Sequence, residues 1–250
     1  MSSVEGLIAE LDRWRTAGIV ARFWWRDDDA ISATPALERL LNVVGDRPIA
    51  VAVVPRDADD RLATRLEMAG NVDVLQHGWA HQNHANEPPN SEYPAGRSAD
   101  QVSAEIRDGR ARLLQLFGRR ALPVFVPPWH GFHDGYFELL NGACLTGFSS
   151  KGARSSPYVH ELTQVNIHCV PIAWTSPPSF GDPEPFVSQL CTHLEGRRTG
   201  RFDRDEPTGV LTHHLVQDEA SYAFIRDILA IIDQHPAATW ASARELFRLT

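Results

Sequence analysis

The chain has 250 residues, 43% of them hydrophobic, and a formal net charge of −8. This length is enough to bury one large core, and α/β barrels of this size often form a single domain. The chain is mildly acidic and its clusters of basic residues are short, so it lacks the positive surface that binds a nucleic-acid backbone. No nucleic-acid partner is expected.

The sequence gives no sign of membrane insertion or export. No segment approaches the ~20 apolar residues that span a bilayer. Residues 1–14 contain early acidic residues and no long apolar stretch, which is not the pattern of a signal peptide. The three cysteines are an odd number without metal-type spacing, which argues against a disulfide framework. We expect a cytoplasmic enzyme with no membrane partner, and the oligomeric state stays open.

Patterns typical of strands alternate with patterns typical of helices. Apolar runs predict strands over residues 19–25, 49–54, 72–76, 123–126, 144–149, 165–173 and 209–213. Helical spacing predicts helices over 4–16, 36–45, 99–117, 184–196 and 219–233. Thr34 with Pro35 indicates an N-cap and a first-turn proline, and Ser98 with Gln101 indicates a capping box.

This alternation predicts a mostly parallel sheet whose faces are covered by helices. Seven strands within one domain, residues 1–250, favour a distorted (β/α)7-type barrel. A doubly wound open sheet is the alternative. In both folds the chemistry is expected at the carboxyl ends of the strands.

Carboxylates and imidazoles do gather at four predicted strand ends. Three aspartates follow the first strand, and histidines follow the third, the fourth and the last. His77 and His81 are four residues apart, so on a helical turn they share a face and can bind one cation. Two histidines and an aspartate are a recognised catalytic zinc set. A solvated turn and a polar loop are the alternative interpretation.

In their order along the chain, these motifs resemble those of the polysaccharide deacetylases, carbohydrate esterase family 4, whose fold is a distorted (β/α) barrel. The family's T-F-D-D-G motif is matched by residues 25–29 (WRDDD), and its H-S/T-x-x-H motif by residues 77–81 (HGWAH). Its R-x-P-Y/W motif is matched in part by residues 126–129 (VPPW), and its last motif by residues 210–213 (VLTH). The likeness covers roughly residues 19–247.

The resemblance implies a role for each motif residue. Asp27 would be the catalytic base, and Asp28 would bind a divalent metal, expected to be zinc, together with His77 and His81. His213 would be the general acid that protonates the departing amine. The alternative register lies one residue later, with Asp28 and Asp29 as the acidic pair and His214 as the acid. The residues expected to contact the substrate are Trp79, His84, Pro128, Trp129, His130 and His214.

The sequence departs from the family at the arginine that pairs with the catalytic aspartate. Val126 stands at its position. Arg26, Lys151 and Arg154 are the local candidates for a replacement, although strand alternation tends to point Arg26 away from Asp27. The glycine after the two aspartates is Asp29, and no clear fourth motif is visible, with Trp174 the nearest candidate.

The implied reaction is metal-assisted removal of an acyl group, expected to be acetyl, from an amide such as an N-acetylated sugar. One alternative is a metal-independent hydrolase of a small cyclic or ureido amide. Others are a non-catalytic carbohydrate-binding protein and a metal-dependent phosphoesterase, for which no convergent Lys/Arg set is visible. The long polar loop 82–97 is predicted to cover the site. The remaining histidines are interpreted as incidental, namely His160, His168, His193 and His235.

Overall fold

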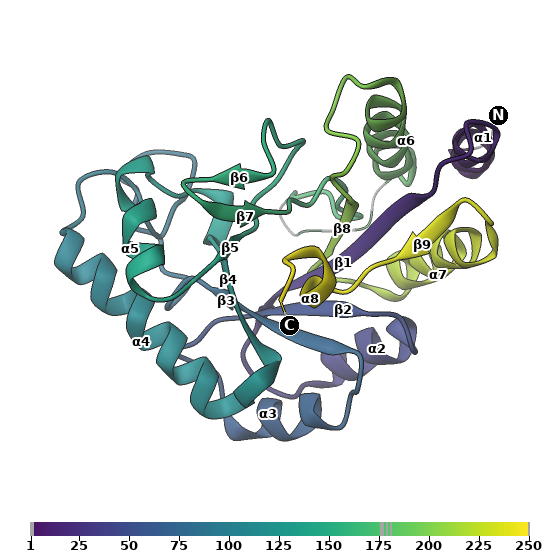
Figure 1. The fold of residues 1–250 in the computed structure, drawn as a ribbon. Coiled ribbons are helices and arrows are strands. Elements are labelled where there is room, and N and C mark those ends of the chain that lie inside the picture. Colours follow the sequence, from purple (N-terminus) through teal and green to yellow (C-terminus); the bar gives the residue numbers. More distant parts are fainter. Residues whose placement is uncertain (1–2, 176–177, 179, 181, 250) are drawn as a thin grey trace.

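One curled sheet carries all the strands, and helices cover its outer face (Figure 1). The computed structural model describes residues 3–175, 178, 180 and 182–249. The strand order is β6-β7-β5-β4-β3-β2-β1-β8, with β9 beside β1, and only β6 and β7 pair in antiparallel fashion. The strands are β1 Ala21–Ala30, β2 Ile49–Val53, β3 Val72–His77, β4 Ala121–Val126, β5 Gly147–Phe148, β6 Tyr158–Val159, β7 Leu162–Gln164, β8 Thr208–Thr212 and β9 Ala238–Trp240.

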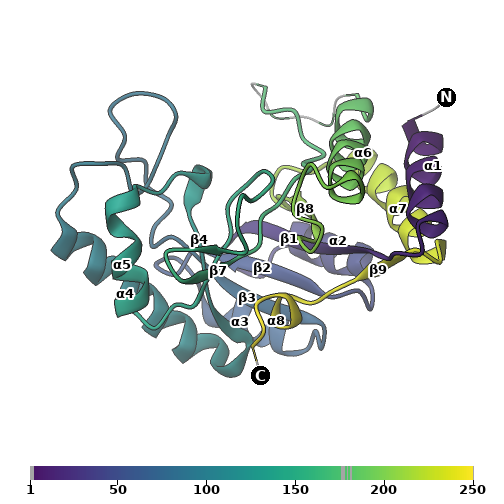
Figure 2. The same cartoon turned by 45° about the horizontal axis from the view of Figure 1, so that its top comes forward.

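The helices flank the sheet on two sides. Figures 1 and 2 show α4 and α5 at one side, and α1, α6 and α7 at the other. The α-helices are α1 Ser3–Thr16, α2 Pro35–Val44, α3 Asp60–Glu67, α4 Ala99–Phe117, α5 Phe137–Gly142, α6 Glu184–Thr199, α7 Glu219–Gln234 and α8 Ala243–Leu246. No helix of the described part of the chain is long and apolar enough to cross a membrane.

The two faces of the sheet bury different clusters, as strand alternation requires. In β1, Trp24 belongs to the inner cluster, which fills the curl of the sheet with aliphatic side chains of β2, β3, β4 and β8. Phe23 and Trp25 point the opposite way, into the cluster that joins the sheet to α1, α2, α6 and α7. Leu246 and Phe247, at the end of the chain, join the inner cluster. The direction of each side chain in β1 therefore follows from its place in the alternation.

The predicted parallel (β/α) barrel is confirmed, with two irregular edges. The predicted strand 165–173 is present only as an irregular segment, which bridges through Ile167 to Lys151 and through Cys169 to Val210 of β8. This segment closes the curl between β8 and the far strands. The hairpin β6–β7 and the short β9 were not predicted, because such short strands carry no readable periodicity.

The helix signals were only partly right. The Thr34 side chain accepts a hydrogen bond from the Leu37 amide, and Pro35 opens α2, as the sequence predicts. Ser98 does precede α4, but it makes no side-chain capping hydrogen bond, so the predicted capping box is absent. The predicted position of α4 is nevertheless correct, because the helical spacing of its buried residues determines where the helix lies in the sequence.

Candidate active site

The site is built on an irregularity near the end of β1. Asp27 pairs with Val51 of β2, and Ala30 pairs with Val53, so three steps along β1 span two steps along β2. Such an extra residue is a β-bulge, which redirects side chains. Asp29, inside the bulge, has the left-handed backbone (φ 74°) that non-glycine residues rarely adopt. As a result, two successive aspartates, Asp28 and Asp29, reach the mouth of the barrel.

Asp29, and not Asp28, lies with the two histidines of β3 and the following turn. One carboxylate oxygen of Asp29 is 3.1 Å from Nε2 of His77 and 3.2 Å from Nε2 of His81. The three side chains can each offer one ligand atom, and these atoms all lie within 4.8 Å of one another. The geometry favours the later of the two registers for the acidic pair.

The tautomer of His77 suits a metal ligand. Its Nδ1 lies 3.1 Å from the carbonyl oxygen of Val126, which can only accept a hydrogen bond. Nδ1 therefore carries a proton, and the neutral ring keeps a lone pair on Nε2, which faces Asp29. The ring centres of His77 and His81 are 5.2 Å apart. Two imidazoles that share a tetrahedral ion through Nε2 have ring centres about 5 Å apart, so the pair fits a divalent cation.

A buried carboxylate, Glu92, shapes the turn between the two histidines. It accepts hydrogen bonds from the amides of Trp79 (3.2 Å) and Ala80 (2.7 Å). Gly78 has a φ of 58°, and a Cβ there would lie 2.7 Å from Cγ of Pro128 as well as against Glu92. Only glycine fits this position, so the turn that presents His81 depends on both residues. No sequence pattern had pointed to Glu92.

Asp28 pairs with Arg26 instead of joining the histidines. Nε of Arg26 is 2.8 Å from Oδ1 of Asp28, and Nη2 is 2.9 Å from Oδ2. Both side chains are buried, and Nη1 of Arg26 donates to the hydroxyl and carbonyl of Ser149. Moving Asp28 onto a metal would leave the guanidinium buried and unpaired, at a cost of about 3–5 kcal/mol. Asp28, the expected metal ligand, is therefore placed against Arg26 and not between the two histidines.

Of the three cations considered as replacements for the arginine missing at Val126, Arg26 is the one that pairs with an aspartate of this site. Residues 26 and 28 share the inner face because they are two apart in a strand. The alternation that points Arg26 away from Asp27 thus points it at Asp28. Arg154 pairs with Asp203 instead, and Lys151 has an exposed side chain.

The charges around the site favour ionised carboxylates. Burial opposes ionisation of Asp28, but Arg26, followed by His77 and His213, more than offsets it and lowers the pKa of Asp28. Burial likewise opposes ionisation of Asp29, but its hydrogen bond and attraction to His77 lower its pKa strongly. Burial disfavours the charged form of His77, yet Asp28 and Asp29 outweigh it and raise the pKa of His77. The cluster therefore attracts positive charge.

Asp27, expected to be the base, lies on the outer face of the sheet. Its carboxylate accepts from the Thr212 hydroxyl (2.6 Å), the His214 amide (3.0 Å) and Nδ1 of His214. All three residues are buried beneath the helices. His214, an expected substrate contact, faces away from the barrel mouth, as does Asp27. Alternation is the physical reason, since Asp27 points outward with Phe23 and Trp25.

His213 lies on the site side of the end of β8. It is close enough to lower the pKa of both Asp28 and Asp29. Its Nδ1 is buried and has no hydrogen-bond partner in the described structure. The exposed ring of Trp174 meets it edge-on, with ring centres 4.8 Å apart. His213 therefore lies near both Asp28 and Asp29.

Of the other expected substrate contacts, Pro128, Trp129 and His130 lie near the site residues, whereas His84 and Trp79 have other contacts. Trp129 lies against His81, with ring centres 4.2 Å apart, and Pro128 is buried under Gly78. His130 is near enough to Arg26 and Asp28 for their charges to affect it. His84 instead responds to Arg97 and Glu105, and its amide bonds to Ser91. Trp79 is half-buried, and its main chain, bonded to Arg56 and Glu92, fixes the turn.

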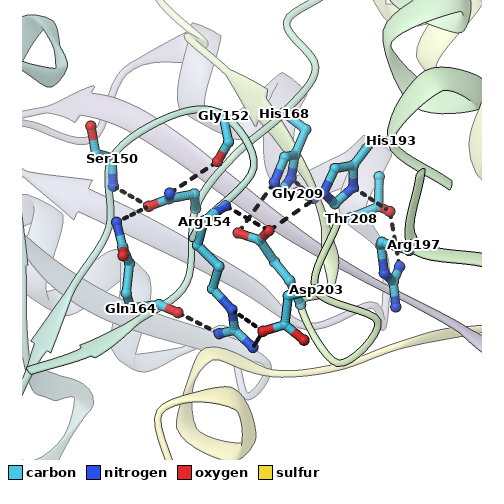
Figure 3. Close-up of polar contacts among 12 residues, drawn as sticks. Ser150, Gly152, Arg154, Gln164, His168, His193, Arg197, Asp203, Thr208 and Gly209 are labelled. Carbon is cyan, nitrogen blue, oxygen red and sulfur yellow. Dashed lines mark hydrogen bonds and ion pairs between the residues drawn. The ribbon is translucent and has the colours of Figure 1, made fainter. Parts of the chain in front are cut away.

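A second group, at the other end of β8, also combines two histidines and a carboxylate (Figure 3). Glu206 has one oxygen 3.3 Å from Nε2 of His168 and the other 3.5 Å from Nε2 of His193. The Gly209 amide donates to Nδ1 of His168 (2.9 Å), and the Thr208 hydroxyl contacts Nδ1 of His193 (3.0 Å). These two histidines, interpreted as incidental, thus form a buried cluster.

This second cluster does not suit a metal. An amide can only donate, so Nδ1 of His168 must carry a lone pair and the proton of the neutral ring is on Nε2. That Nε2, which lies 3.3 Å from an oxygen of Glu206, therefore has no lone pair for a cation. In addition, the rings of His168 and His193 are stacked with centres 3.4 Å apart, well below the separation of about 5 Å for two ligands of one tetrahedral ion. Only the first group fits a cation.

Comparison with known proteins shows likeness in structure and not in sequence. No protein-family model and no curated protein sequence matches the chain. A family 4 acetyl xylan esterase from Clostridium thermocellum, in complex with a cobalt ion, has a TM-score of 0.54 at 17% identity, covering 91% of each chain. The chitin deacetylase of Colletotrichum lindemuthianum has a TM-score of 0.56 at 12% identity, covering 91% of this chain and 88% of its own.

A third similar structure is a peptidoglycan N-acetylglucosamine deacetylase, in complex with an N-oxidanyl-benzamide. Its TM-score is 0.57 at 12% identity, and the alignment covers 95% of this chain and 96% of the deacetylase. At such low identities the likeness demonstrates a shared fold over nearly the whole length.

The first prediction separates Asp28 from Asp29 as the metal ligand. Asp29→Asn should weaken Zn²⁺ binding at least tenfold, because it removes the carboxylate that faces both histidines. Asp28→Asn should leave binding nearly unchanged. Isothermal titration of metal-free protein measures both, with circular dichroism as the control for folding. The reverse ranking of the two variants would restore Asp28 as the ligand.

The same titration tests the second cluster. We expect one Zn²⁺ per wild-type chain and none in a His77→Ala/His81→Ala variant. The second cluster should not bind the ion, because Nε2 of His168 carries a proton and has no lone pair to offer. A residual stoichiometric ion in that double variant would show that our assignment of the His168 tautomer is wrong.

The second prediction concerns acid stability. Burial lowers the pKa of His193 to about 4, against 6.5 ordinarily. The unfolded chain therefore takes up this proton more readily, and the free energy of unfolding should fall as pH drops from about 6.5 to 4. In His193→Gln the slope should be smaller by up to about 1.4 kcal/mol per pH unit, since one titrating group is gone. Urea unfolding from pH 4 to 7 measures it, and equal slopes would contradict it.

Proposed function

We propose that this chain, which has the fold of the family 4 carbohydrate esterases, is a divalent-metal-dependent hydrolase that removes an acyl group, most simply acetyl, from an amide. The observation that carries the proposal is that two adjacent aspartates have different partners. Asp29 faces two imidazole lone-pair positions, and Asp28 is held beside them by a guanidinium. A binding protein needs no such ionised, positioned base.

Asp29, His77 and His81 would hold the metal. A cation bound there supplies Lewis-acid activation of a water molecule and of the acyl carbonyl. The cobalt ion in the similar acetyl xylan esterase supports a divalent cation in this fold, and we propose zinc for this chain because two imidazoles and a carboxylate suit it.

Asp28 is the proposed base. Arg26 occupies both of its oxygens, but a carboxylate oxygen has a further lone pair, so Asp28 can still accept a proton from the attacking water. Its lowered pKa keeps it ionised at neutral pH. The bidentate ion pair fixes the direction of the carboxylate, which serves general-base catalysis because the base must be within hydrogen-bond reach of its proton.

His213 is the proposed general acid. It lies on the neighbouring strand, within electrostatic reach of both aspartates. The departing nitrogen must be protonated, because an amine anion is a very poor leaving group. Its Nδ1 has no partner among the described residues, and the exposed Trp174 ring lies beside it.

We propose an N-acetylated sugar or a related small molecule as the substrate. The named substrates of similar structures, chitin and a peptidoglycan N-acetylglucosamine, support this class. A metal-independent hydrolase of a small cyclic amide is the second candidate, but nothing in the geometry favours it over the metal-dependent one. Removal of the metal with a chelator distinguishes the two.

The third prediction tests the reaction and the base. Zn²⁺-loaded protein should release acetate from tri-N-acetylchitotriose or from another N-acetyl sugar in a panel. Asp28→Asn should lower kcat at least a hundredfold with the metal still bound, because the proton acceptor is lost while Asp29 and the two histidines are unchanged. Asp27→Asn is the matched control and should keep most of the activity. Full activity in Asp28→Asn, with loss in Asp27→Asn, would return the role of base to Asp27.

The fourth prediction concerns Arg26. Replacing it with methionine removes the guanidinium that lowers the pKa of Asp28, so that pKa should rise. A base must be ionised to act, and the acidic limb of the kcat/KM profile should therefore move to higher pH. Lys151→Met is the control and should leave the limb in place. The same acidic limb in wild type and Arg26→Met would show that Arg26 does not tune the base.

A further inference from the structure

The turn that follows β4 holds two successive bulky residues in an unfavourable backbone conformation. Trp129 has a φ of 54° and His130 a φ of 62°. The left-handed region is uncommon for residues other than glycine, and such strain clusters at functional sites. Gly131, the next residue, has an ordinary φ of −97°, so the glycine of this turn does not relieve the strain.

Main-chain hydrogen bonds keep His130 in that conformation. Its amide donates to the carbonyl of Pro127 (3.0 Å), and its own carbonyl accepts from the hydroxyl of Ser150 (3.1 Å). The neighbouring Ser149 binds Arg26. The backbone of the turn is thus held against the segment that also supports the guanidinium of Arg26.

The ring of His130 contains a polar atom that is left without a partner in the described part of the chain. Its Nδ1 is buried and has no hydrogen-bond partner among the described residues. The charges that act on the ring belong to Arg26, Asp28, Lys151 and His77, which places it on the Asp28 side of the site. Burial, followed by Arg26, lowers the pKa of His130 to about 3, so the ring is neutral at neutral pH.

A role in packing alone does not explain these features together. Buried polar atoms are nearly always hydrogen-bonded, and the exceptions require an explanation. Glycine or asparagine would adopt the same backbone at less cost. A strained residue whose buried ring nitrogen lacks a partner is accounted for when a bound molecule supplies that partner.

We propose that His130 is a further catalytic residue, whose Nδ1 forms a hydrogen bond with the acyl-amide substrate bound beside Asp28. This inference rests on the proposed function. A neutral imidazole can donate to a developing negative charge without first losing or gaining a proton, and such fixed donors act mainly in the transition state. We therefore expect the loss of His130 to lower kcat more than it raises KM.

Three substitutions at this position test the assignment. His130→Gly suits the backbone and removes the ring. His130→Asn also tolerates the left-handed backbone and places a polar atom near the position of Nδ1, whereas His130→Gln places one near that of Nε2. With Zn²⁺ and tri-N-acetylchitotriose, the His130→Gly and His130→Gln variants should have a kcat at least tenfold below that of wild type. The His130→Asn variant should have a kcat much closer to that of wild type. All three variants should keep one Zn²⁺ and a Tm near that of wild type.

A binding measurement keeps this test separate from the deacetylase function. Acetohydroxamate, titrated calorimetrically into Zn²⁺-loaded protein, should bind wild type and His130→Asn similarly, and the Gly and Gln variants at least tenfold more weakly. If wild type releases no acetate, the proposed function fails, and this comparison still decides the role of His130. Wild-type kcat and acetohydroxamate affinity in His130→Gly, or equal effects in Asn and Gln, would overturn the proposal.

Discussion

The candidate site depends on one extra residue in β1. A regular strand points alternate side chains to opposite faces, and it could present only one of two adjacent aspartates to the barrel mouth. The bulge between Asp27 and Ala30, with Asp29 in the left-handed region, lets two consecutive carboxylates reach the same space. One then faces the histidines while the other faces the guanidinium. Every role proposed for the site follows from this local break in alternation.

Three consecutive aspartates thus acquire three different partners. Asp27 is held by His214 and Thr212 on the outer face, Asp28 by Arg26 on the inner face, and Asp29 by His77 and His81. Buried carboxylates are costly unless they are paired, and each of these has a partner of suitable charge or hydrogen-bonding capacity. The separation of the partners keeps the three side chains from competing for one cation.

Much of the fold was readable from the sequence, but the register of the site was not. The strand–helix alternation and the order of the motifs correctly located the barrel and the strand ends that meet at the mouth. A bulge leaves no mark in residue pattern, so the choice between Asp28 and Asp29 stayed open. Because Asp27 was the expected base, strand alternation predicted that Arg26 points away from the site. His168, His193 and Glu206 lie far apart in the chain and come together only through the packing of α6 and β8.

The pairing of Arg26 with Asp28 also has a consequence for how such proteins evolve and are recognised. Two paired groups contributed by different strands separate when either strand shifts. Here the two groups are two residues apart on one strand, and the backbone itself sets their spacing. Position 126 then needs no charged residue and can belong to the apolar core, as Val126 does. A motif search that insists on arginine there would pass over every protein that keeps its counter-ion in this way.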